Sequence, residues 1–371
     1  MKKVFIESPC FGFGPISTSI SLAKQIQKNY DVEFITYGEA KEFLEKNLNN
    51  HIISIDTRYE KNFDKLLNYI NKKDIIVVNT NVELSVYLLK KGYKVLTVDT
   101  LYWMWNNVPK IYTQNPYFIA QTYYGQNITK LPLKIECRPI INYDIWKPES
   151  VLKNANVLIS FGGMAEPGEH TFILKYAHFI IRHIISCFHN INIDTFYVVG
   201  GLFSKQDKNK YNKKVKIIDS LEAGKYKKLV NKCSYIFLSP GLTSLYEMMY
   251  AQRKFCLLPG LSVSQVYQVN HFKEKFNFPF CIVWKDSSSL IKKFDKLPEL
   301  EALTCFESYM NSLKESDINF EKVISEYIKS VNHSQYYWIN NKEIKRIYNK
   351  RDFTEIAVHM LKQMEGKDSS E

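Results

Sequence analysis

The sequence has no feature of a membrane-spanning or exported chain. No apolar run approaches the ~20 residues of a transmembrane helix, and the apolar part of the N-terminal segment 1–9 is too short for a signal peptide. The seven cysteines are widely spaced and form no Cys-x-x-Cys pair, which indicates buried free thiols in a reducing compartment. We therefore expect a cytoplasmic protein whose contact with membranes is peripheral at most.

Motifs for metal chemistry and for covalent catalysis are also missing. His178, His183 and His189 do not have the spacing of a zinc site, and no Asp-x-Asp pair is present to hold a metal-bound diphosphate. No Gly-x-Ser-x-Gly elbow or Cys/His arrangement supplies a nucleophile for hydrolysis. We expect no metal site and no cofactor.

The chain is basic, but its charge is not concentrated. It has 371 residues, 45% hydrophobic and 14% aromatic, which is enough for two domains with packed cores. Its formal net charge of +12 points to anionic partners in general. Because the lysines are scattered and no RNA-binding motif or polybasic arm is present, we expect no nucleic-acid partner. An anionic small-molecule substrate would suit the same charge.

Short apolar runs alternate with helical patterns along most of the chain. The run 74–79 is apolar on both faces, as in a parallel sheet. The alternation predicts an α/β protein with two Rossmann-like, doubly wound halves. Strands are expected at residues 3–7, 31–36, 51–55, 74–79, 94–99 and 138–141 in the first half and at 156–161, 195–199, 215–218 and 235–238 in the second.

Linker-like composition around residues 144–150 marks the crossing between the halves. We expect an N-terminal domain over 1–146, a second domain over 147–334 and a basic helical segment over 335–371. Residues 366–371 are polar, and we expect them to form a frayed tail.

The stretch 238–247 carries the clearest functional signal. The strand 235–238 is stopped by Pro240 and Gly241, and Thr243 and Ser244 then offer N-cap oxygens to a helix that has Glu247 one turn in. A helix start of this kind exposes backbone N–H groups to which a phosphate can bind. The alternative is an ordinary strand–turn–helix with a capping glutamate.

A second apolar run at 255–258 ends in Pro259 and Gly260, and a helical stretch with Gln265 and Gln268 follows. This order resembles the donor-binding region of the GT-B glycosyltransferases. The similarity is closest to the branch that contains the lipid II-forming N-acetylglucosaminyltransferase and the pseudaminic-acid-pathway nucleotide-sugar hydrolase. It extends over about residues 155–275 and is only architectural elsewhere.

The resemblance implies the fold and most of the site. The GT-B fold has two Rossmann-like domains that face a cleft, and its last helix commonly returns to the first domain. The first domain would bind the acceptor and the second the nucleotide sugar, most often a UDP-sugar. By position, Glu247 would hold the ribose, Leu221 would lie near the base, and Gln265 with Gln268 would meet the sugar. The residues expected at the diphosphate are Gly162, Gly163, Gly241, Thr243 and Ser244, and Leu242 is a further expected donor-binding residue.

The first half departs from the GT-B pattern in one respect. The loop after the first strand contains Gly12, Phe13 and Gly14, at a place where related enzymes often carry a histidine that acts as a base. A lone Gly-x-Gly is weak support for a dinucleotide site. We expect this loop to contact the acceptor, together with Trp103 and Trp105, which follow the strand 94–99. The alternative is that these tryptophans pack against the flank of their own domain.

Without that histidine, Asp99 at the end of the strand 94–99 is the leading candidate for the general base. A structural aspartate that caps the next turn is the alternative, and Glu7 and His170 are weaker candidates. If no base exists, the donor phosphate can take the proton and the reaction would be retaining.

The sequence thus predicts an inverting, metal-independent glycosyltransferase of the hexosyl or N-acetylhexosaminyl class that acts on a small-molecule acceptor. A nucleotide-sugar hydrolase or epimerase on the same fold is the first alternative. A non-catalytic sugar-nucleotide-binding or partner subunit is the second; the missing histidine supports it and Glu247 counts against it. The sequence identifies neither the sugar, the acceptor nor the oligomeric state.

Overall fold

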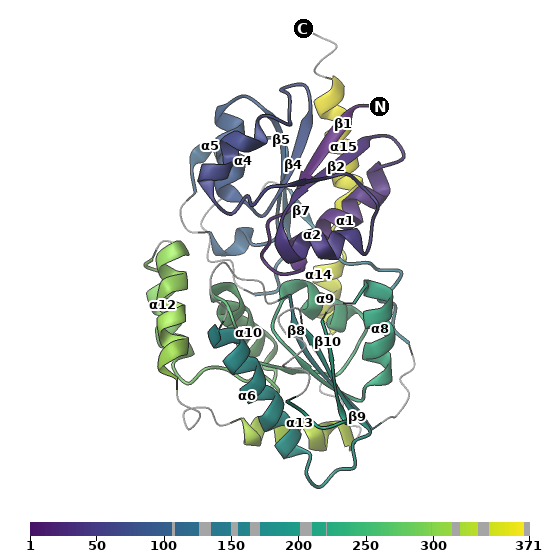
Figure 1. Cartoon of the computed structure of the whole chain (residues 1–371), viewed down its shortest axis with the longest axis vertical. Coiled ribbons are helices and arrows are strands. Elements are labelled where there is room, and N and C mark those ends of the chain that lie inside the picture. Colours follow the sequence, from purple (N-terminus) through teal and green to yellow (C-terminus); the bar gives the residue numbers. More distant parts are fainter. Residues whose placement is uncertain are drawn as a thin grey trace. The chain divides into compact units, whose positions relative to one another are not determined.

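The computed structural model describes residues 1–105, 108–125, 135–149, 155–163, 171–200, 210–219, 221–297, 299–313, 320–332 and 341–366. The chain divides into two compact units (Figure 1). Unit 1 comprises Met1–Asn142 and Lys345–Glu371, and unit 2 comprises Tyr143–Ile344.

Unit 1 is built on a seven-stranded parallel sheet with the order β3-β2-β1-β4-β5-β6-β7. The central strand β4 is buried on both faces, which is why its residues 75–78 are all apolar. The strands are β1 (Lys3–Glu7), β2 (Asp31–Thr36), β3 (Ile52–Ser54), β4 (Ile75–Asn79), β5 (Lys94–Asp99), β6 (Phe118–Gln121) and β7 (Glu136–Cys137). The helical segments between them are α1 (Gly14–Ile26), α2 (Gly38–Glu45), η1 (Glu60–Asn62), α3 (Phe63–Leu66), α4 (Val82–Lys90), η2 (Tyr102–Met104) and α5 (Lys110–Gln114).

The C-terminal segment belongs to unit 1. It contains the end of α14 (Asn341–Tyr348) and α15 (Phe353–Gly366), and α15 packs against α1, β5 and β6. One face of α15 is fully buried through Phe353, Ile356, Ala357, Met360, Leu361 and Met364. The expected return of the last helix to the first domain is therefore confirmed.

Unit 2 has a five-stranded parallel sheet with the order β10-β9-β8-β11-β12. Its strands are β8 (Asn156–Gly162), β9 (Thr195–Gly200), β10 (Val215–Ile218), β11 (Tyr235–Leu238) and β12 (Cys256–Leu257). Its helices are α6 (Thr171–Cys187), α8 (Ala223–Lys232), α9 (Leu242–Tyr250), α10 (Val263–Phe276), α11 (Ser287–Phe294), α12 (Glu299–Ser312) and α13 (Glu321–Asn332).

The expected α/β class with two doubly wound sheets is confirmed, but some elements differ. The prediction of a strand at 138–141 is wrong, because the edge strand β7 ends at Cys137. Pro139 follows two residues later, and proline has no N–H to donate to the hydrogen-bond ladder of a sheet. Strand β6 was not expected, since it lies inside an aromatic segment without clear alternation. The units divide at residues 142/143 and 344/345.

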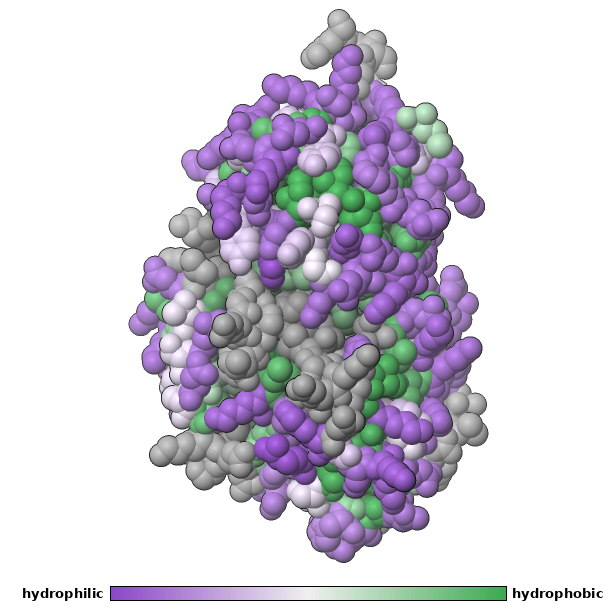
Figure 2. Space-filling view, in the orientation of Figure 1, coloured by the Kyte–Doolittle hydropathy of each residue, from purple (hydrophilic) through white to green (hydrophobic). Residues whose placement is uncertain are grey.

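The face of the molecule that is shown in Figure 2 is mainly polar in its described parts. On the face shown in Figure 2, hydrophilic residues cover most of the described surface, and apolar residues show between them in small patches. Within the described ranges, no helix combines the length and the apolar character needed to cross a bilayer. The same ranges contain no group of three His, Cys, Asp or Glu side chains placed to bind a metal ion.

Candidate functional site

The turn from β11 into α9 lies at the carboxyl edge of the unit 2 sheet. The Ser239 N–H donates to the carbonyl of Ser160 at 2.8 Å, so the turn is anchored to the end of β8. Helix α9 begins at Leu242, with Gly241 as its N-cap residue in an extended conformation (φ −73°, ψ 132°). Because glycine has no side chain, the N-cap residue satisfies none of the first-turn N–H groups itself.

This geometry corrects one expectation about the turn. Thr243 and Ser244 are not N-cap residues but the second and third residues of the helix. They are already helical, and an N-cap residue must keep a non-helical backbone for its oxygen to reach the first-turn N–H groups. The uncapped first turn of α9 therefore presents backbone donors and the positive end of the helix dipole.

Glu247 lies one turn further along α9 in a half-buried position. Burial raises the pKa of its carboxyl group to about 8, while the Trp146 indole N–H and the Lys227 ammonium act in the opposite direction. Trp146 is fully buried, and the Lys227 nitrogen lies 5.3 Å from the centre of its ring. Beside them, the Tyr226 hydroxyl donates to Ser160 Oγ at 2.9 Å. Glu247 is thus part of a polar cluster at the ends of β8 and β11.

Gly162, the last residue of β8, and Gly163 lie beside this turn, because β8 and β11 are neighbours in the sheet. Gly162 adopts φ +68°, a left-handed conformation that favours glycine, at the point where the register with β9 shifts. Gly163 follows directly. Leu221 is half-buried after β10, with β9 between it and β8. The structure therefore brings Gly162, Gly163, the Gly241 turn and Glu247 to one edge and leaves Leu221 further along it.

The two glutamines follow β12, on the other side of β11. Gln265 Oε1 accepts a hydrogen bond from the Leu261 N–H at 2.9 Å, so its side chain is held against the loop that precedes α10. Gln268 is only 2% exposed. Gly260 shapes this loop, because a Cβ there would lie 2.4 Å from the Val266 nitrogen. Of the two glutamines, Gln265 is thus the more accessible to a ligand.

In unit 1, the loop after β1 turns at Gly12, which has φ +70°. Phe13 is the N-cap residue of α1, and Gly14 and Pro15 begin the helix. The Phe13 ring stacks on Phe43 of α2 with centroids 4.7 Å apart. Phe11 is the exposed residue of this loop, whereas Gly12 is buried and the Phe13 ring is occupied by an internal contact.

The two tryptophans are engaged in packing. Trp103 is 2% exposed and stacks on Tyr123 with ring centroids 3.9 Å apart. Trp105 is half-buried, and its indole N–H donates to Asp99 Oδ2 at 2.8 Å. This arrangement matches the alternative in which the tryptophans pack against the flank of their own domain.

Asp99 is fully buried, and both of its carboxylate oxygens accept hydrogen bonds. Oδ1 accepts from the Leu101 N–H at 2.8 Å, and Oδ2 accepts from Trp105 and from the Tyr112 hydroxyl at 2.6 Å. Burial raises the pKa of Asp99 to about 6, and these donors lower it. The contacts favour the structural alternative, an aspartate that fixes the turn after β5.

Glu7 is enclosed in the same way at the end of β1. Its Oε1 accepts from the Thr57 hydroxyl at 2.6 Å and from the Asn81 amide at 3.0 Å, and Oε2 accepts from the Asn79 N–H at 3.3 Å. Burial raises the pKa of Glu7 to about 7 against these three hydrogen bonds. Glu7 therefore ties β1, β4 and the loop after β3 together. His170 lies outside the described residues.

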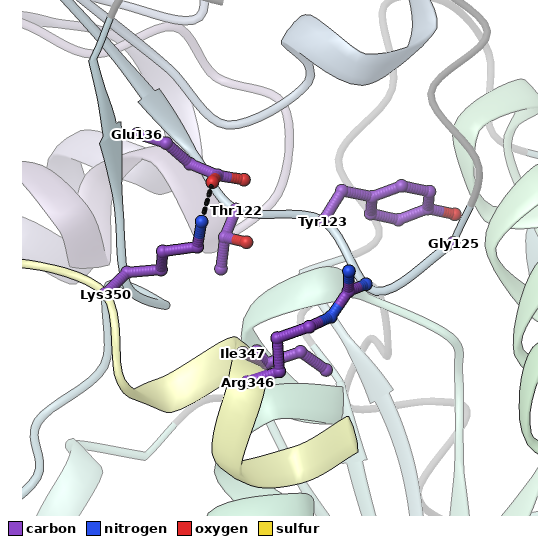
Figure 3. Close-up of a pocket in the computed structure, with 7 residues that line it drawn as sticks. All are labelled: Thr122, Tyr123, Gly125, Glu136, Arg346, Ile347 and Lys350. Atoms are coloured by element: carbon purple, nitrogen blue, oxygen red, sulfur yellow. Dashed lines mark ion pairs between the residues drawn. The ribbon is translucent and has the colours of Figure 1, made fainter. Parts of the chain in front are cut away.

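A small cavity of about 260 Å³ lies at the carboxyl end of β6, next to the returning C-terminal segment (Figure 3). Lys350 pairs with Glu136 in its wall at 2.7 Å, and the Arg346 side chain extends toward the segment of Tyr123 and Gly125. The remaining lining residues are Thr122 and Ile347. Sequence reasoning missed this cavity because its walls are more than 200 residues apart in the chain.

No protein-family model matches the sequence. No curated protein matches it either.

The solved structures, in contrast, include many with the same architecture. The spinosyn rhamnosyltransferase SpnG aligns with 97% of this chain and 100% of its own length at a TM-score of 0.60 and 9% identity. The spinosyn forosaminyltransferase SpnP aligns with 98% of this chain and 99% of its own length, at a TM-score of 0.54 and 10% identity. MurG of Acinetobacter baumannii aligns with 90% of this chain and 98% of its own length, at a TM-score of 0.46 and 13% identity. The fold assignment does not depend on this match. The chain has the two-domain GT-B fold of glycosyltransferases.

Proposed function

We propose that the chain is a glycosyltransferase that uses a nucleoside-diphosphate sugar, with UDP as the expected nucleotide. The observation that carries the proposal is the turn from β11 into α9, where uncapped N–H groups and the Glu247 carboxyl lie one helical turn apart. The N–H groups suit a diphosphate and the carboxyl suits a pair of ribose hydroxyls. Gly162 and Gly163 allow the same edge to approach a ligand closely.

The chemistry that we propose is displacement at the anomeric carbon. The acceptor oxygen forms the new bond to this carbon while the bond to the diphosphate oxygen breaks, and the electron pair leaves with the diphosphate. The first-turn N–H groups of α9 would stabilise the charge that develops there. An inverting course also needs a base for the acceptor proton. A retaining course needs none, because the departing phosphate can take the proton.

The test is calorimetric titration of the full chain with UDP, TDP, GDP, CDP and ADP in the absence of added metal. We expect one nucleotide to bind at micromolar concentration and Glu247→Gln to weaken that binding at least about tenfold, the effect of losing hydrogen bonds to a charged group. Glu326→Gln is the matched control, since Glu326 is an exposed residue on α13 of the same unit. Absence of binding to all five nucleotides would contradict the proposal.

One observation favours a second candidate, a sugar-nucleotide-binding protein without transferase activity. The loop after β1 has no histidine, and the carboxylates of Asp99 and Glu7 are already occupied by internal donors. Incubation of the protein with UDP-glucose and UDP-N-acetylglucosamine separates the candidates. Release of free sugar without an acceptor would indicate a hydrolase, and an altered donor sugar an epimerase. An unchanged donor despite nucleotide binding is expected both of a transferase without its acceptor and of the non-catalytic candidate, so sugar transfer to supplied acceptor alcohols separates these two.

A further inference from the structure

The segment 143–149 begins unit 2 and packs against α8. It forms neither a helix nor a strand, so side-chain contacts hold it in place. The Trp146 ring lies edge-on to the Tyr226 ring of α8, with ring centroids 5.9 Å apart. The carbonyl oxygen of Lys147 accepts a hydrogen bond from the Lys227 ammonium of the same helix at 2.9 Å. Two neighbouring side chains of α8 therefore fix this segment beside the polar cluster described above.

The indole N–H of Trp146 is buried without a hydrogen bond. Trp146 is fully buried, and its Nε1 atom has no partner within hydrogen-bond distance among the described residues. The N–H nevertheless acts on the Glu247 carboxyl, whose pKa it lowers against the larger effect of burial. An unsatisfied buried donor costs free energy, and an ionised carboxylate accepts a stronger hydrogen bond than a protonated carboxyl group does. The indole therefore favours the charged form of Glu247.

A buried ammonium lies over the ring that carries this N–H. Lys227 is 4% exposed, and its nitrogen is 5.3 Å from the centre of the Trp146 ring. The face of an indole ring is negative and its edge is positive, so the ring suits a cation on its face and an anion at its N–H edge. The same ammonium lowers the pKa of Glu247 directly. Lys227 and Trp146 thus act on the carboxyl group in the same direction.

The other titratable groups around Glu247 do not replace this pair. Burial raises the pKa of Tyr226, and Glu247 acts in the same direction, so the phenol is neutral near pH 7. Burial lowers the pKa of Lys227, with Glu149 opposing this effect and Arg253 adding to it. Among the described residues, Lys227 is the one cation that acts on Glu247. The charge of the Glu247 carboxyl is therefore governed by Trp146 and Lys227 against burial.

The ionised form of Glu247 is the one that suits a ribose. A carboxylate offers about four acceptor sites on its two oxygens, whereas a protonated carboxyl group gives up one of them to its own hydrogen. A pair of ribose hydroxyls donates two hydrogen bonds, so the Trp146 N–H can occupy a further site without displacing them. With a pKa of about 8, the ligand-free carboxyl group is largely protonated at neutral pH. Groups that stabilise its ionised form therefore strengthen binding of the ribose.

We propose that Trp146 and Lys227 are positioning residues of the donor site. The Trp146 N–H donates to the ionised Glu247 carboxylate and leaves its remaining acceptor sites to the ribose hydroxyls. Lys227 supports the negative charge from the face of the indole ring. Both residues act through Glu247 and not through a contact with the nucleotide. This inference rests on the proposed function, because the ribose that Glu247 binds belongs to the proposed donor.

The test is calorimetric titration of the full chain with UDP at pH 7 and at pH 9.5. Trp146→Phe keeps a buried ring and removes the N–H, so Glu247 ionises less readily. We expect the affinity of this variant for UDP to fall about threefold to tenfold at pH 7, the effect of one hydrogen bond. At pH 9.5, where the carboxyl group is ionised in both proteins, the loss should narrow to less than about twofold. Lys227→Met should change the affinity in the same direction at pH 7.

Trp284→Phe is the matched control. Trp284 is also buried in unit 2, but its indole N–H donates to the Gly260 carbonyl oxygen at 2.8 Å. The affinity of this variant for UDP should therefore keep the wild-type dependence on pH. A second measurement needs no nucleotide. In a carbon NMR titration of the Glu247 carboxyl, assigned by comparison with Glu247→Gln, the midpoint should lie at a higher pH in Trp146→Phe than in the wild type. Circular dichroism of each variant checks that it is folded.

Two results would overturn the inference and leave the proposed function standing. One is an equal loss of UDP affinity at pH 7 and at pH 9.5 in Trp146→Phe, which would mean that the indole only packs. The other is an unchanged titration midpoint of Glu247 in that variant. Absence of binding by all five nucleotides to the wild-type chain would instead refute the proposed function, and the positioning role would fall with it. A loss that narrows at pH 9.5, together with a raised midpoint, supports both.

Discussion

The Arg138 guanidinium donates to the Asp352 carboxylate at 2.6 Å, although the two residues are 214 positions apart in the sequence. Asp352 also precedes α15, and its Oδ1 atom accepts hydrogen bonds from the Thr354 and Glu355 N–H groups at 2.8 and 3.3 Å. One carboxylate therefore caps the last helix and fixes it to the end of the unit 1 sheet. Burial raises the pKa of Asp352, but the hydrogen bonds from Thr354, Arg138 and Glu355 together hold this pKa below its usual value.

The two roles of Asp352 can be separated by substitution. Asp352→Ala removes the cap and the ion pair, and we expect it to lower the free energy of unfolding by about 1–2 kcal/mol. Asp352→Asn keeps a capping oxygen and loses only a partly exposed ion pair, with an expected cost below about 1 kcal/mol. Urea denaturation of both variants checks this order. Equal losses would show that the ion pair, and not the cap, holds α15.

The sheets were predictable because their sequence signal is local. Residues 75–78 are all apolar, and they lie in β4, a strand that is buried on both faces. The turn into α9 was likewise predictable, because the apolar strand 235–238 is followed by Pro240 and Gly241. What the sequence did not reveal was the N-cap position, because Gly241, Thr243 and Ser244 are all acceptable at a helix start. Only the backbone conformation of Gly241 decides between them.

The parts of the site that could not be predicted depend on tertiary contacts. The sequence pattern places Asp99 at a strand end, as a catalytic residue would be, but not the Trp105 and Tyr112 donors that enclose it. Exposure was equally hidden, since Trp103 and Tyr37 both follow strands, yet one is 2% exposed and the other 46%. Which aromatic side chain faces solvent is determined by neighbours that are remote in sequence.

Burial of Glu7 makes the stability of unit 1 depend on pH. The pKa of its carboxyl group is raised from 4.5 to about 7 in the folded chain. Below pH 4.5 the carboxyl group is protonated in both the folded and the unfolded chain, so it adds no pH dependence to the free energy of unfolding. Between pH 4.5 and 7 the unfolded chain releases its proton and the folded chain keeps it, so the free energy of unfolding falls as pH rises, by about 3 kcal/mol in total.

Thermal denaturation across this range checks the Glu7 prediction. Glu7→Gln should remove this part of the pH dependence, although it also leaves the Asn79 N–H facing an amide donor and so lowers stability at every pH. Glu33→Gln is a suitable control, because the pKa of Glu33 is lowered by Lys3 and its contribution has the opposite sign. An unchanged pH profile in Glu7→Gln would mean that Glu7 is ionised throughout.

The raised pKa of Glu247 leads to a prediction about nucleotide binding. In the ligand-free chain the carboxyl group titrates at about pH 8, so much of it is protonated at neutral pH. A ribose that donates two hydroxyl hydrogen bonds favours the carboxylate. Binding should therefore release protons, and affinity should rise as pH increases from 7 to 9, at most about tenfold for each pH unit. Glu247→Gln should abolish this increase, because an amide does not titrate.

Calorimetry in two buffers with different ionisation enthalpies measures the proton release directly. The observed binding enthalpy of the wild-type protein should depend on the buffer. The binding enthalpy of Glu247→Gln should be the same in both buffers. Glu326→Gln on the exposed face of α13 should behave as the wild type does. A buffer-independent enthalpy in the wild type, with unchanged nucleotide affinity in Glu247→Gln, would remove Glu247 from the donor site. In that case α9 would contribute only its N-terminal N–H groups.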